Sequence, residues 1–359
     1  MEGSLNGVKC FFAAANSGYG FYSFYDDIFE DGGITDRYII KGGPGTGKSR
    51  FMKELAYNAR GKGMSVVTYS CSSDPSSLDG VIIDKGNGER MCVLDGTAPH
   101  ICEASLPGAR DTILNFCEFW DAELLKLQKE SIIELNLKKS RAYHSASDCL
   151  HSALLVRREY DKAVLNATDR DRIASLVKKY VSSSQRSEKY CEQIGIATSF
   201  GMFGKYTLNT YRTLVKNVFV IDNSYGNACV FLDCLLSYAR TGGISTCRSY
   251  NFLDPHVLDA VCLTDIGASF ISSDLWTDER ESYEVKQISM QRFTYKSERT
   301  ALKAYRKRVD AVSKEIYKKA LFDMQKMHAA HFDLERIYSS SMDFSKKEAF
   351  TDEWIAKNL

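Results

Sequence analysis

The sequence predicts an α/β fold that contains two tandem copies of one module. Each copy is expected to hold a parallel sheet sandwiched by helices, followed by a long helical arm. Three observations predict this arrangement: strands and helices alternate with short connections, the chain aligns with itself, and two long stretches lack helix breakers. With 359 residues, the chain is long enough for two such cores.

The first diagnostic element is a strand that leads through a Gly-rich turn into a helix. Residues 38–40 are apolar, as in a buried strand, and residues 49–60 have a helical pattern. The turn between them fits the phosphate-binding loop G-x-x-x-x-G-K-[ST], in which glycines turn backbone N–H groups toward an anion at a helix N-terminus. We therefore expect ATP here. The expected nucleotide-binding residues are Gly42, Gly43, Pro44, Gly45, Thr46, Gly47, Lys48, Ser49 and Arg50.

The next element is an apolar strand, residues 91–95, that ends in an acidic residue. Its last residue, Asp95, is expected to hold Mg²⁺ together with the hydroxyl of Ser49, as in a Walker B strand. Lys48 is expected to contact the β- and γ-phosphates, so Lys48 and Asp95 are the catalytic candidates. Many ATP-driven motors have a glutamate after this aspartate, but Gly96 stands here. Fast autonomous hydrolysis is therefore not expected.

Residues 37–84 align without a gap to residues 217–264, with eleven identical pairs among forty-eight. In this register Ala228 replaces Lys48, Cys229 replaces Ser49, and Asp222 adds a carboxylate. The strand at 268–272 lacks the acidic residue that ends its counterpart. A charge-assisted contact and a hard metal ligand are lost, so the second copy is expected to bind no Mg-nucleotide.

Two breaker-free stretches follow the two copies and predict the helical arms. Neither Gly nor Pro occurs in residues 109–194 or from 268 to the end. Residues 160–181 align with 338–359 without a gap, so each repeat is expected to comprise a core and its arm. The predicted domains are 1–187, with the intact loop, and 188–359, with the degenerate loop, joined near Ser182–Gln185.

Positive charge is concentrated in the arms. Residues 126–190 carry fourteen Lys or Arg against eight Asp or Glu, and residues 286–326 carry twelve against four. Solvated helix faces are the favoured interpretation, and binding of nucleic acid is the alternative. The eleven cysteines include no C-x-x-C pair, there is no basic n-region, and no apolar stretch approaches a bilayer span. We expect a cytoplasmic protein with no membrane partner.

The chain resembles a known family in three runs. They are residues 38–49 with the loop, residues 70–83 reading SCSSDPSSLDGVII, and residues 94–100 reading LDGTAPH, and the tail at 337–344 is similar too. These runs resemble a bacterial family of tandem P-loop ATPase-like proteins of unassigned reaction, found largely in spore-forming Gram-positive bacteria. The resemblance implies ATP binding at Gly42, Gly47, Lys48 and Ser49. It also implies a doubled architecture, in which both copies usually keep the motif, whereas the second is degenerate here.

Three further residues are candidates for chemistry. Asp74 and Asp79 follow the strand at 65–69, at the edge where doubly wound folds bind ligands. A base or substrate anchor is one interpretation, but a turn is favoured because both persist as Asp254 and Asp259. His100 is either a γ-phosphate sensor or acid–base group, or an ordinary residue of a turn.

The leading functional hypothesis is a Mg-ATP-binding protein with slow or partner-stimulated hydrolysis, which acts as a nucleotide-dependent switch. In it, Arg240 or Arg248 of the second copy reaches across to the γ-phosphate. One alternative is a small-molecule or nucleoside kinase that uses Asp74 or Asp79 as base. A second is a non-enzymatic ATP-dependent scaffold that binds nucleic acid through the arms. The substrate or protein partner is not identified by the sequence.

Overall fold

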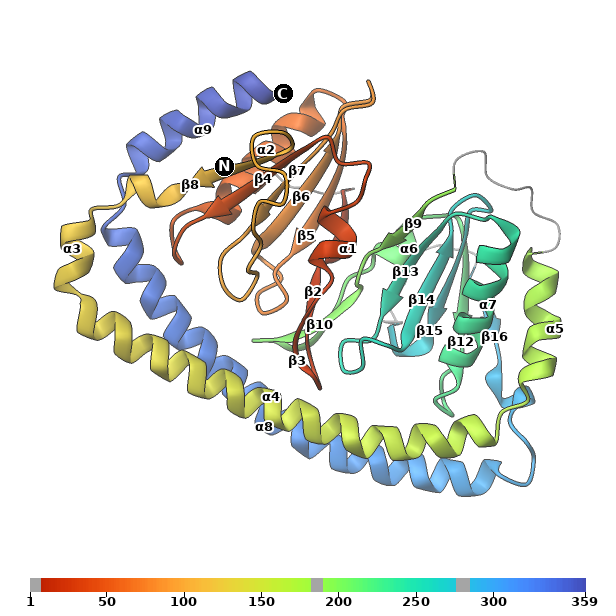
Figure 1. The fold of residues 1–359 in the computed structure, drawn as a ribbon. Coiled ribbons are helices and arrows are strands. Elements are labelled where there is room, and N and C mark those ends of the chain that lie inside the picture. The colour runs from red at the N-terminus through yellow and green to blue at the C-terminus, as the bar shows by residue number, and fades with distance from the viewer. Residues whose placement is uncertain (1–7, 182–189, 276–284) are drawn as a thin grey trace.

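The structure is a computed structural model that describes residues 8–181, 190–275 and 285–359. Two β-sheets stand on a pair of long helices, α4 (Lys129–Asn166) and α8 (Arg299–Ser340), as Figure 1 shows. These helices run antiparallel and pack against each other along their length. The predicted α/β class is confirmed, and the predicted helical arms correspond to these helices. The predicted joint near residues 182–185, and with it the domain boundary at 187, lies outside the described residues.

The first half of the chain forms a six-stranded sheet in the order β1-β5-β6-β7-β4-β8. Its strands are β1 (Lys9–Phe12), β4 (Asp36–Lys41), β5 (Ser65–Ser70), β6 (Leu78–Asp84), β7 (Arg90–Asp95) and β8 (Asp111–Asn115). A hairpin of β2 (Ala14–Ser17) and β3 (Gly20–Ser23) projects from it. The helices are α1 (Tyr25–Phe29), α2 (Lys48–Gly61), the 3-10 helix η1 (Phe116–Phe119), α3 (Ala122–Leu127), α4 and α5 (Arg170–Val181).

The second half repeats this plan in the order β9-β13-β14-β15-β12-β16. Its strands are β9 (Glu192–Ile194), β12 (Asn217–Ile221), β13 (Thr246–Tyr250), β14 (Leu258–Leu263), β15 (Ala268–Ser272) and β16 (Val285–Ile288), with a hairpin of β10 (Thr198–Gly201) and β11 (Gly204–Thr207). The helices are α6 (Thr210–Thr213), α7 (Ala228–Gly242), η2 (Ser273–Leu275), η3 (Met290–Phe293), α8 and α9 (Phe344–Asn358). Strands that the internal alignment equates therefore occupy equivalent places in the two sheets.

Each sheet is mixed, so the prediction of a parallel sheet is wrong for one strand. β6 runs antiparallel to both β5 and β7, and β14 does the same between β13 and β15. The remaining pairs of the first sheet, β1–β5, β4–β7 and β4–β8, are parallel. The connections explain the difference, because residues 71–77 form too short a link for the crossover that parallel neighbours need.

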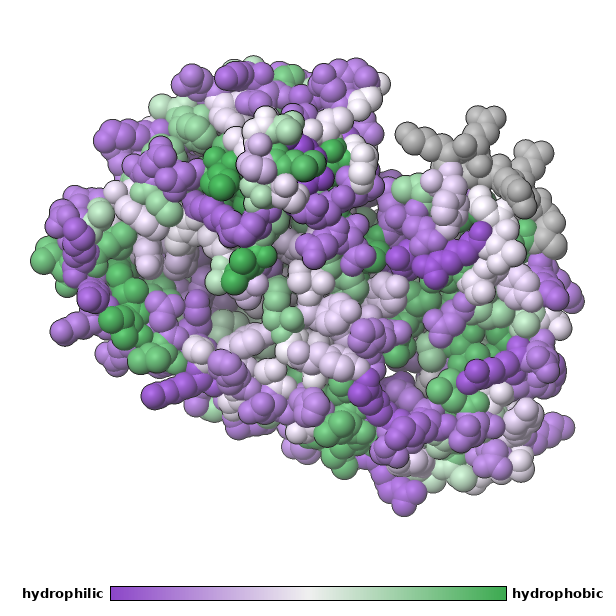
Figure 2. All heavy atoms as spheres, in the orientation of Figure 1, coloured by the Kyte–Doolittle hydropathy of each residue, from purple (hydrophilic) through white to green (hydrophobic). Residues whose placement is uncertain are grey.

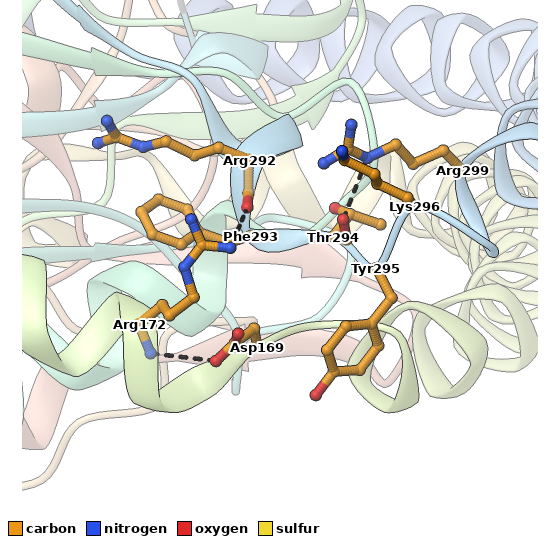
Figure 3. Close-up of a pocket in the computed structure, with 8 residues that line it drawn as sticks. All are labelled: Asp169, Arg172, Arg292, Phe293, Thr294, Tyr295, Lys296 and Arg299. Atoms are coloured by element: carbon orange, nitrogen blue, oxygen red, sulfur yellow. Dashed lines mark hydrogen bonds between the residues drawn. The ribbon is translucent and has the colours of Figure 1, made fainter.

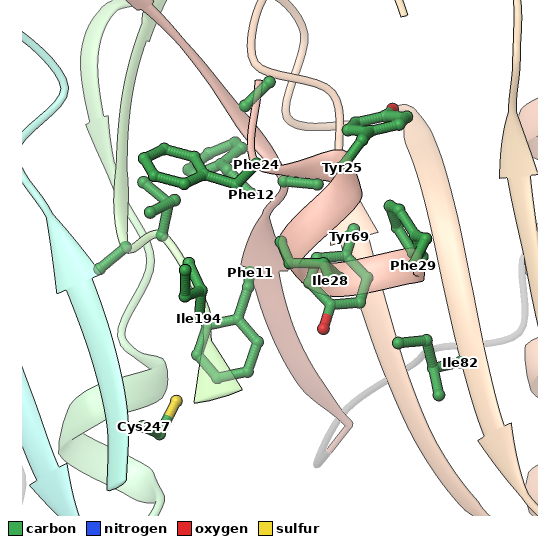
Figure 4. Close-up of a cluster of buried hydrophobic side chains, with 14 of the residues drawn as sticks. Phe11, Phe12, Phe24, Tyr25, Ile28, Phe29, Tyr69, Ile82, Ile194 and Cys247 are labelled. Carbon is green, nitrogen blue, oxygen red and sulfur yellow. The ribbon is translucent and has the colours of Figure 1, made fainter. Parts of the chain in front are cut away.

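The two sheets share one apolar core between their inner faces. Figure 4 shows Tyr69 and Ile82 of the first sheet on one side, Ile194 and Cys247 of the second on the other, and Phe11 between them. The outer face of the first sheet packs on α2, and that of the second on α7. Because strand residues alternate between faces, the buried strands are apolar on both sides. The predicted sandwich of helices around each sheet is therefore replaced by a helix outside and a shared core inside.

The ends of the two arms are exchanged between the halves. Helix α5, which ends the first arm, packs on α7 of the second half. Helix α9, which ends the second arm, packs on α2 and η1 of the first half, where Trp354 and Ile355 join the apolar cluster around α2. Figure 1 shows both crossings at the two ends of the long helix pair. Each predicted module of core plus own arm is thus completed by the arm of the other module.

The structure also corrects the alignment of the arms. Asp169 and Asp343 hold equivalent places, because the side chain of each accepts a hydrogen bond from the first turn of the next helix, at 3.1 and 3.0 Å. Their backbone N–H groups donate to Phe293 and Phe119, both at 2.7 Å. The gap-free alignment equates Asp169 with Lys347 instead and is wrong by one turn. Apolar helix positions recur with each turn, which makes such shifted registers look alike.

The face of the molecule in Figure 2 is largely hydrophilic, with apolar side chains gathered over α3 and the start of α4. Among them Leu127 is 81% exposed, and Leu124 is also exposed. Within the described ranges, no helix combines the length and the apolar character that crossing a membrane requires.

Candidate functional site

The predicted phosphate loop lies between β4 and α2, at the carboxyl edge of the first sheet. Gly45 and Gly47 have φ angles of 71° and 81°, a region that side-chain-bearing residues rarely adopt. Gly47 is the N-cap of α2, so the first N–H groups of this helix open at the loop. The hydroxyl of Thr46 donates to the carbonyl of Gly43 at 2.9 Å and braces the turn. The backbone thus has the form that an anion at a helix N-terminus requires.

Lys48 and Asp95 are brought together by neighbouring parallel strands. Asp95 ends β7, which pairs with β4, and its carboxylate lies 3.5 Å from the Lys48 ammonium. The same ammonium donates to the carbonyls of Gly42 and Gly43, both at 2.8 Å. Lys48 therefore folds back over the loop from the first turn of α2. The structure thus brings these two predicted site residues together.

The other expected ligands have protein partners of their own. The hydroxyl of Ser49 accepts a hydrogen bond from the N–H of Leu78 at 2.9 Å, which ties the helix start to β6. The guanidinium of Arg50 pairs with Glu54 at 2.8 Å and with Glu348 on α9 at 3.2 Å. The side chain of Arg50 thus joins α2 to α9, and only its backbone faces the helix start.

A buried carboxylate–imidazole pair lies near the loop. Asp79, in β6 rather than in the turn that the sequence favoured, accepts from His100 Nε2 at 3.1 Å. Burial lowers the pKa of His100, but the carboxylates of Asp79 and then Asp95 raise it by more than burial lowers it, so the pKa is raised overall. The ring stacks on Tyr25 with centroids 5.0 Å apart, and within the described residues its Nδ1 has no hydrogen-bond partner. Asp74, by contrast, accepts from the N–H and hydroxyl of Ser76, as the turn interpretation expects.

The thiol of Cys71 lies beside this pair. One ligand atom each from Cys71, Asp79 and His100 lie within 4.8 Å of one another. A thiol and an imidazole favour a softer ion such as Zn²⁺, whereas the oxygens of Ser49 and Asp95 suit Mg²⁺. The first sheet edge therefore contains two ligand sets of different chemical character.

The loop is covered by the second arm. A Cβ on Gly45 would lie 2.5 Å from the carbonyl oxygen of Glu335, and one on Gly43 would lie 2.9 Å from the ring of Tyr338. Only glycine permits this approach of α8 to the loop.

The imidazole of His331 lies 3.6 Å from the carboxylate of Glu335, and burial lowers the pKa of His331 to about 4. Lys347 of α9 reaches Gly47. Sequence reasoning did not predict this cover, because no local pattern encodes contacts between such distant segments.

The corresponding loop of the second half is closed by its own side chains. The amide of Asn223 accepts from the N–H of Ala228, the first residue of α7, at 2.9 Å and donates to Asp274 at 2.7 Å. The carboxylate of Asp222 accepts from the N–H and hydroxyl of Ser224, each at 3.0 Å. Groups that a phosphate would contact are thus already bonded. A cavity of about 770 Å³ lies beside this loop.

Arg240 and Arg248 do not support the expectation that they reach the first loop. Arg240 donates to both carboxylate oxygens of Glu192 at 2.8 Å, and Arg248 pairs with the same carboxylate. Both arginines therefore fasten β9 to the edge of the second sheet. The basic arm residue that reaches the first loop is instead Lys347 of α9.

Comparisons of the chain with family models, with curated proteins and with solved structures gave no match. The resemblance to a tandem ATPase-like family therefore stays a prediction.

Proposed function

We propose that the chain consists of two tandem P-loop NTPase-like modules, and that only the first binds Mg-ATP. The observation that carries this proposal is the placement of Lys48 over the loop carbonyls and 3.5 Å from Asp95, beside the glycines with positive φ. Such a cradle offers backbone N–H groups, a helix N-terminus and a lysine ammonium to one polyphosphate. Ser49 and Asp95 would hold Mg²⁺, which neutralises charge on the phosphates when bound.

Hydrolysis is expected to be slow or stimulated by a partner. A glutamate cannot take the place of Gly96, because a Cβ there would lie 2.3 Å from the Ile39 side chain. An acid–base group must therefore come from elsewhere, and we assign this role to His100. In the neutral ring, Nε2–H donates to Asp79 and leaves Nδ1 free to accept a proton. Asp79 fixes the tautomer and stabilises the protonated ring.

The nucleotide would act as a switch through the second arm. Glu335 and Tyr338 of α8 lie in close contact with Gly45 and Gly43. A nucleotide that binds at the loop must therefore displace these two residues or fit beneath them. Because α8 also packs along α4, such a movement is passed to both halves. This arrangement favours a switch over a site whose only task is turnover.

The test is substitution of Lys48. Lys48→Ala is expected to weaken ATP binding by about 2–5 kcal/mol, measured by calorimetric titration, because a buried charge contact to phosphate is lost. Lys62→Ala, at the other end of α2, is the matched control and should bind as the natural protein does. Equal ATP affinity of the Lys48→Ala variant and the natural protein would contradict the proposal.

A kinase would use the same pair, with His100 accepting the proton of a substrate hydroxyl rather than of water. An assay with γ-labelled ATP separates the two reactions. Free labelled phosphate as the product supports hydrolysis, and label on an added nucleoside or metabolite supports transfer.

A basic pocket favours the nucleic-acid alternative as a second function. A cavity of about 380 Å³ is lined by Arg172 of α5 and by Arg292, Lys296 and Arg299, which precede or begin α8 (Figure 3). Arg172 and Arg299 donate to the backbone carbonyls of Arg292 and Thr294, both at 3.1 Å, and one carboxylate, that of Asp169, shares the lining with the four cations. Cations in this arrangement suit phosphates of a nucleic-acid backbone. Binding of a labelled oligonucleotide that weakens steeply with salt would support this function, and no binding at low salt would exclude it.

A further inference from the structure

Lys347, in the first turn of α9, is a buried lysine whose charge has no partner. Its side chain is only 1% exposed, and within the described residues its Nζ finds no hydrogen-bond acceptor. A buried ammonium without a partner is costly, and burial accordingly lowers the pKa of this amine. The site is therefore incomplete unless an acceptor from outside the chain enters it.

The amine lies at the amino-terminal end of α2. Cε and Nζ of Lys347 are 3.4 and 3.6 Å from the point where a Cβ on Gly47, the N-cap of α2, would stand. A helix N-terminus carries partial positive charge, so two like charges meet where the phosphate loop also opens. An anion bound at the helix start would compensate both the ammonium of Lys347 and the partial positive charge of the helix.

The charged neighbours of Lys347 do not supply that anion. The groups that act on its pKa are Glu54, Arg50, Glu348 and Asp352. Two of them, Glu54 and Glu348, are already paired with Arg50, at 2.8 and 3.2 Å. Asp352 also acts on the pKa, but no acceptor lies within hydrogen-bond distance of Nζ among the described residues. The acidic neighbours thus make the surroundings less positive, but none of them accepts a hydrogen bond from Nζ of Lys347.

The second half shows that the fold itself does not need a lysine here. Asp169 and Asp343 are equivalent caps, so Ile173 of α5 is the counterpart of Lys347, one turn after the cap. Ile173 is fully buried in the apolar cluster around α7. The half with the closed loop therefore has an apolar residue at this place, and the half with the open loop has an amine.

We propose that Lys347 is the second lysine of the nucleotide site, supplied by the opposite half, and that its ammonium binds a phosphate oxygen of the nucleotide held by the loop. This inference rests on the proposed function. No bond is made or broken in this step; the amine is protonated and donates to the phosphate. Bound nucleotide then ties α9 to α2, so the state of the first site governs how firmly the second arm is docked.

The test compares two lysines of the same helix turn. Lys347→Met removes the charge and is expected to weaken ATP binding about 10- to 100-fold, the range for a hydrogen bond to a charged group. Its thermal stability without nucleotide should be unchanged or higher, because the orphan amine is gone. Lys346→Met is the control, since Lys346 is exposed and pairs with Asp343, and its ATP affinity should match that of the natural protein.

A second measurement does not depend on a variant. In the natural protein, ATP should slow amide hydrogen exchange across residues 344–358 at least several-fold relative to the free protein. ATP affinity unchanged in folded Lys347→Met, or exchange in α9 unaffected by bound ATP, would overturn the inference while leaving the proposed function standing. Failure of the natural protein to bind ATP at all would instead overturn the proposed function.

Discussion

The two halves of this chain share one strand order but treat the start of their central helix in opposite ways. In the second half, Asn223 caps the N–H of Ala228, and Asp222 bonds Ser224, so the loop is complete without a ligand. In the first half, Lys48 bonds only to loop carbonyls and lies next to Asp95, while the amine of Lys347 stands unsatisfied among the described residues. The difference teaches that side-chain caps within a loop can take up the N–H groups that an anion would otherwise contact.

The long helices that cover the two loops also differ in the charged side chains that they place there. Over the second loop, Arg157 of α4 pairs with Asp161 at 2.8 Å. The equivalent pair over the first loop is His331 and Glu335, in which the pKa of the histidine is lowered and that of the carboxyl is raised, both chiefly by burial. At neutral pH the imidazole over the first loop is therefore uncharged, whereas the second loop is covered by an ion pair.

The largest expected difference between the halves concerns the buried Asp79–His100 pair of the first half and Asp259, the counterpart of Asp79 in the second half. His100→Gln is expected to lower the rate of ATP turnover by about 10²–10⁴-fold with little change in ATP affinity, because an acid–base group is lost. Asp259→Asn, which alters the counterpart of Asp79 in the second half, should leave the rate unchanged. Phosphate release under saturating ATP measures both. A His100→Gln enzyme with the natural rate would mean that the pair is only structural.

A second contrast between the halves is a buried ion pair between two strands of the first sheet. Arg37 of β4 pairs with Asp111 of β8, both with fully buried side chains, at 2.6 Å, whereas Asn217, the counterpart of Arg37, is an exposed residue at the start of β12. Asp111→Asn is expected to destabilise the protein by about 3–5 kcal/mol in urea unfolding at pH 7, since Arg37 loses a buried partner. Glu123→Gln, in an exposed pair with Lys126, should cost at most about 1 kcal/mol.

The same pair gives the first half a specific sensitivity to acid. Hydrogen bonds from Arg37 hold the pKa of Asp111 well below its ordinary value. Its contribution is therefore complete above the unfolded pKa of about 4 and is lost as the pH falls toward the native pKa. The difference in unfolding free energy between the natural protein and Asp111→Asn should narrow as the pH falls from about 5 to about 3. A constant gap would mean that Asp111 does not titrate with unfolding.

The smallest effect is expected in the second loop. Ala228→Lys restores the missing lysine, but Asn223 and Asp222 still occupy the loop and no acidic residue ends β15. Placed in a Lys48→Ala background, it should leave ATP affinity unchanged, and because Ala228 is only 1% exposed, a lysine there should also lower the free energy of unfolding. Recovery of ATP binding in that double variant would show that the second site can be reactivated by one charge.

Local patterns in the sequence were enough to predict β4, the loop, α2 and the strand that ends in Asp95, because each is defined by residues close together in the chain. The direction of β6 was missed, although the short link at residues 71–77 contained the information. The pairing of Asp79 with His100 was not predicted, since it depends on how separate strands are placed. Lys347 could not be found either, because it reads as an ordinary polar position of an exposed helix.

The exchange of the arm ends makes the degenerate copy indispensable to the intact one. Helix α9 is encoded with the second half but shields α2 of the first, and α5 does the reverse. Loss of either half would strip the covering helix from the other, so under the proposed function selection on the first site also retains the second core.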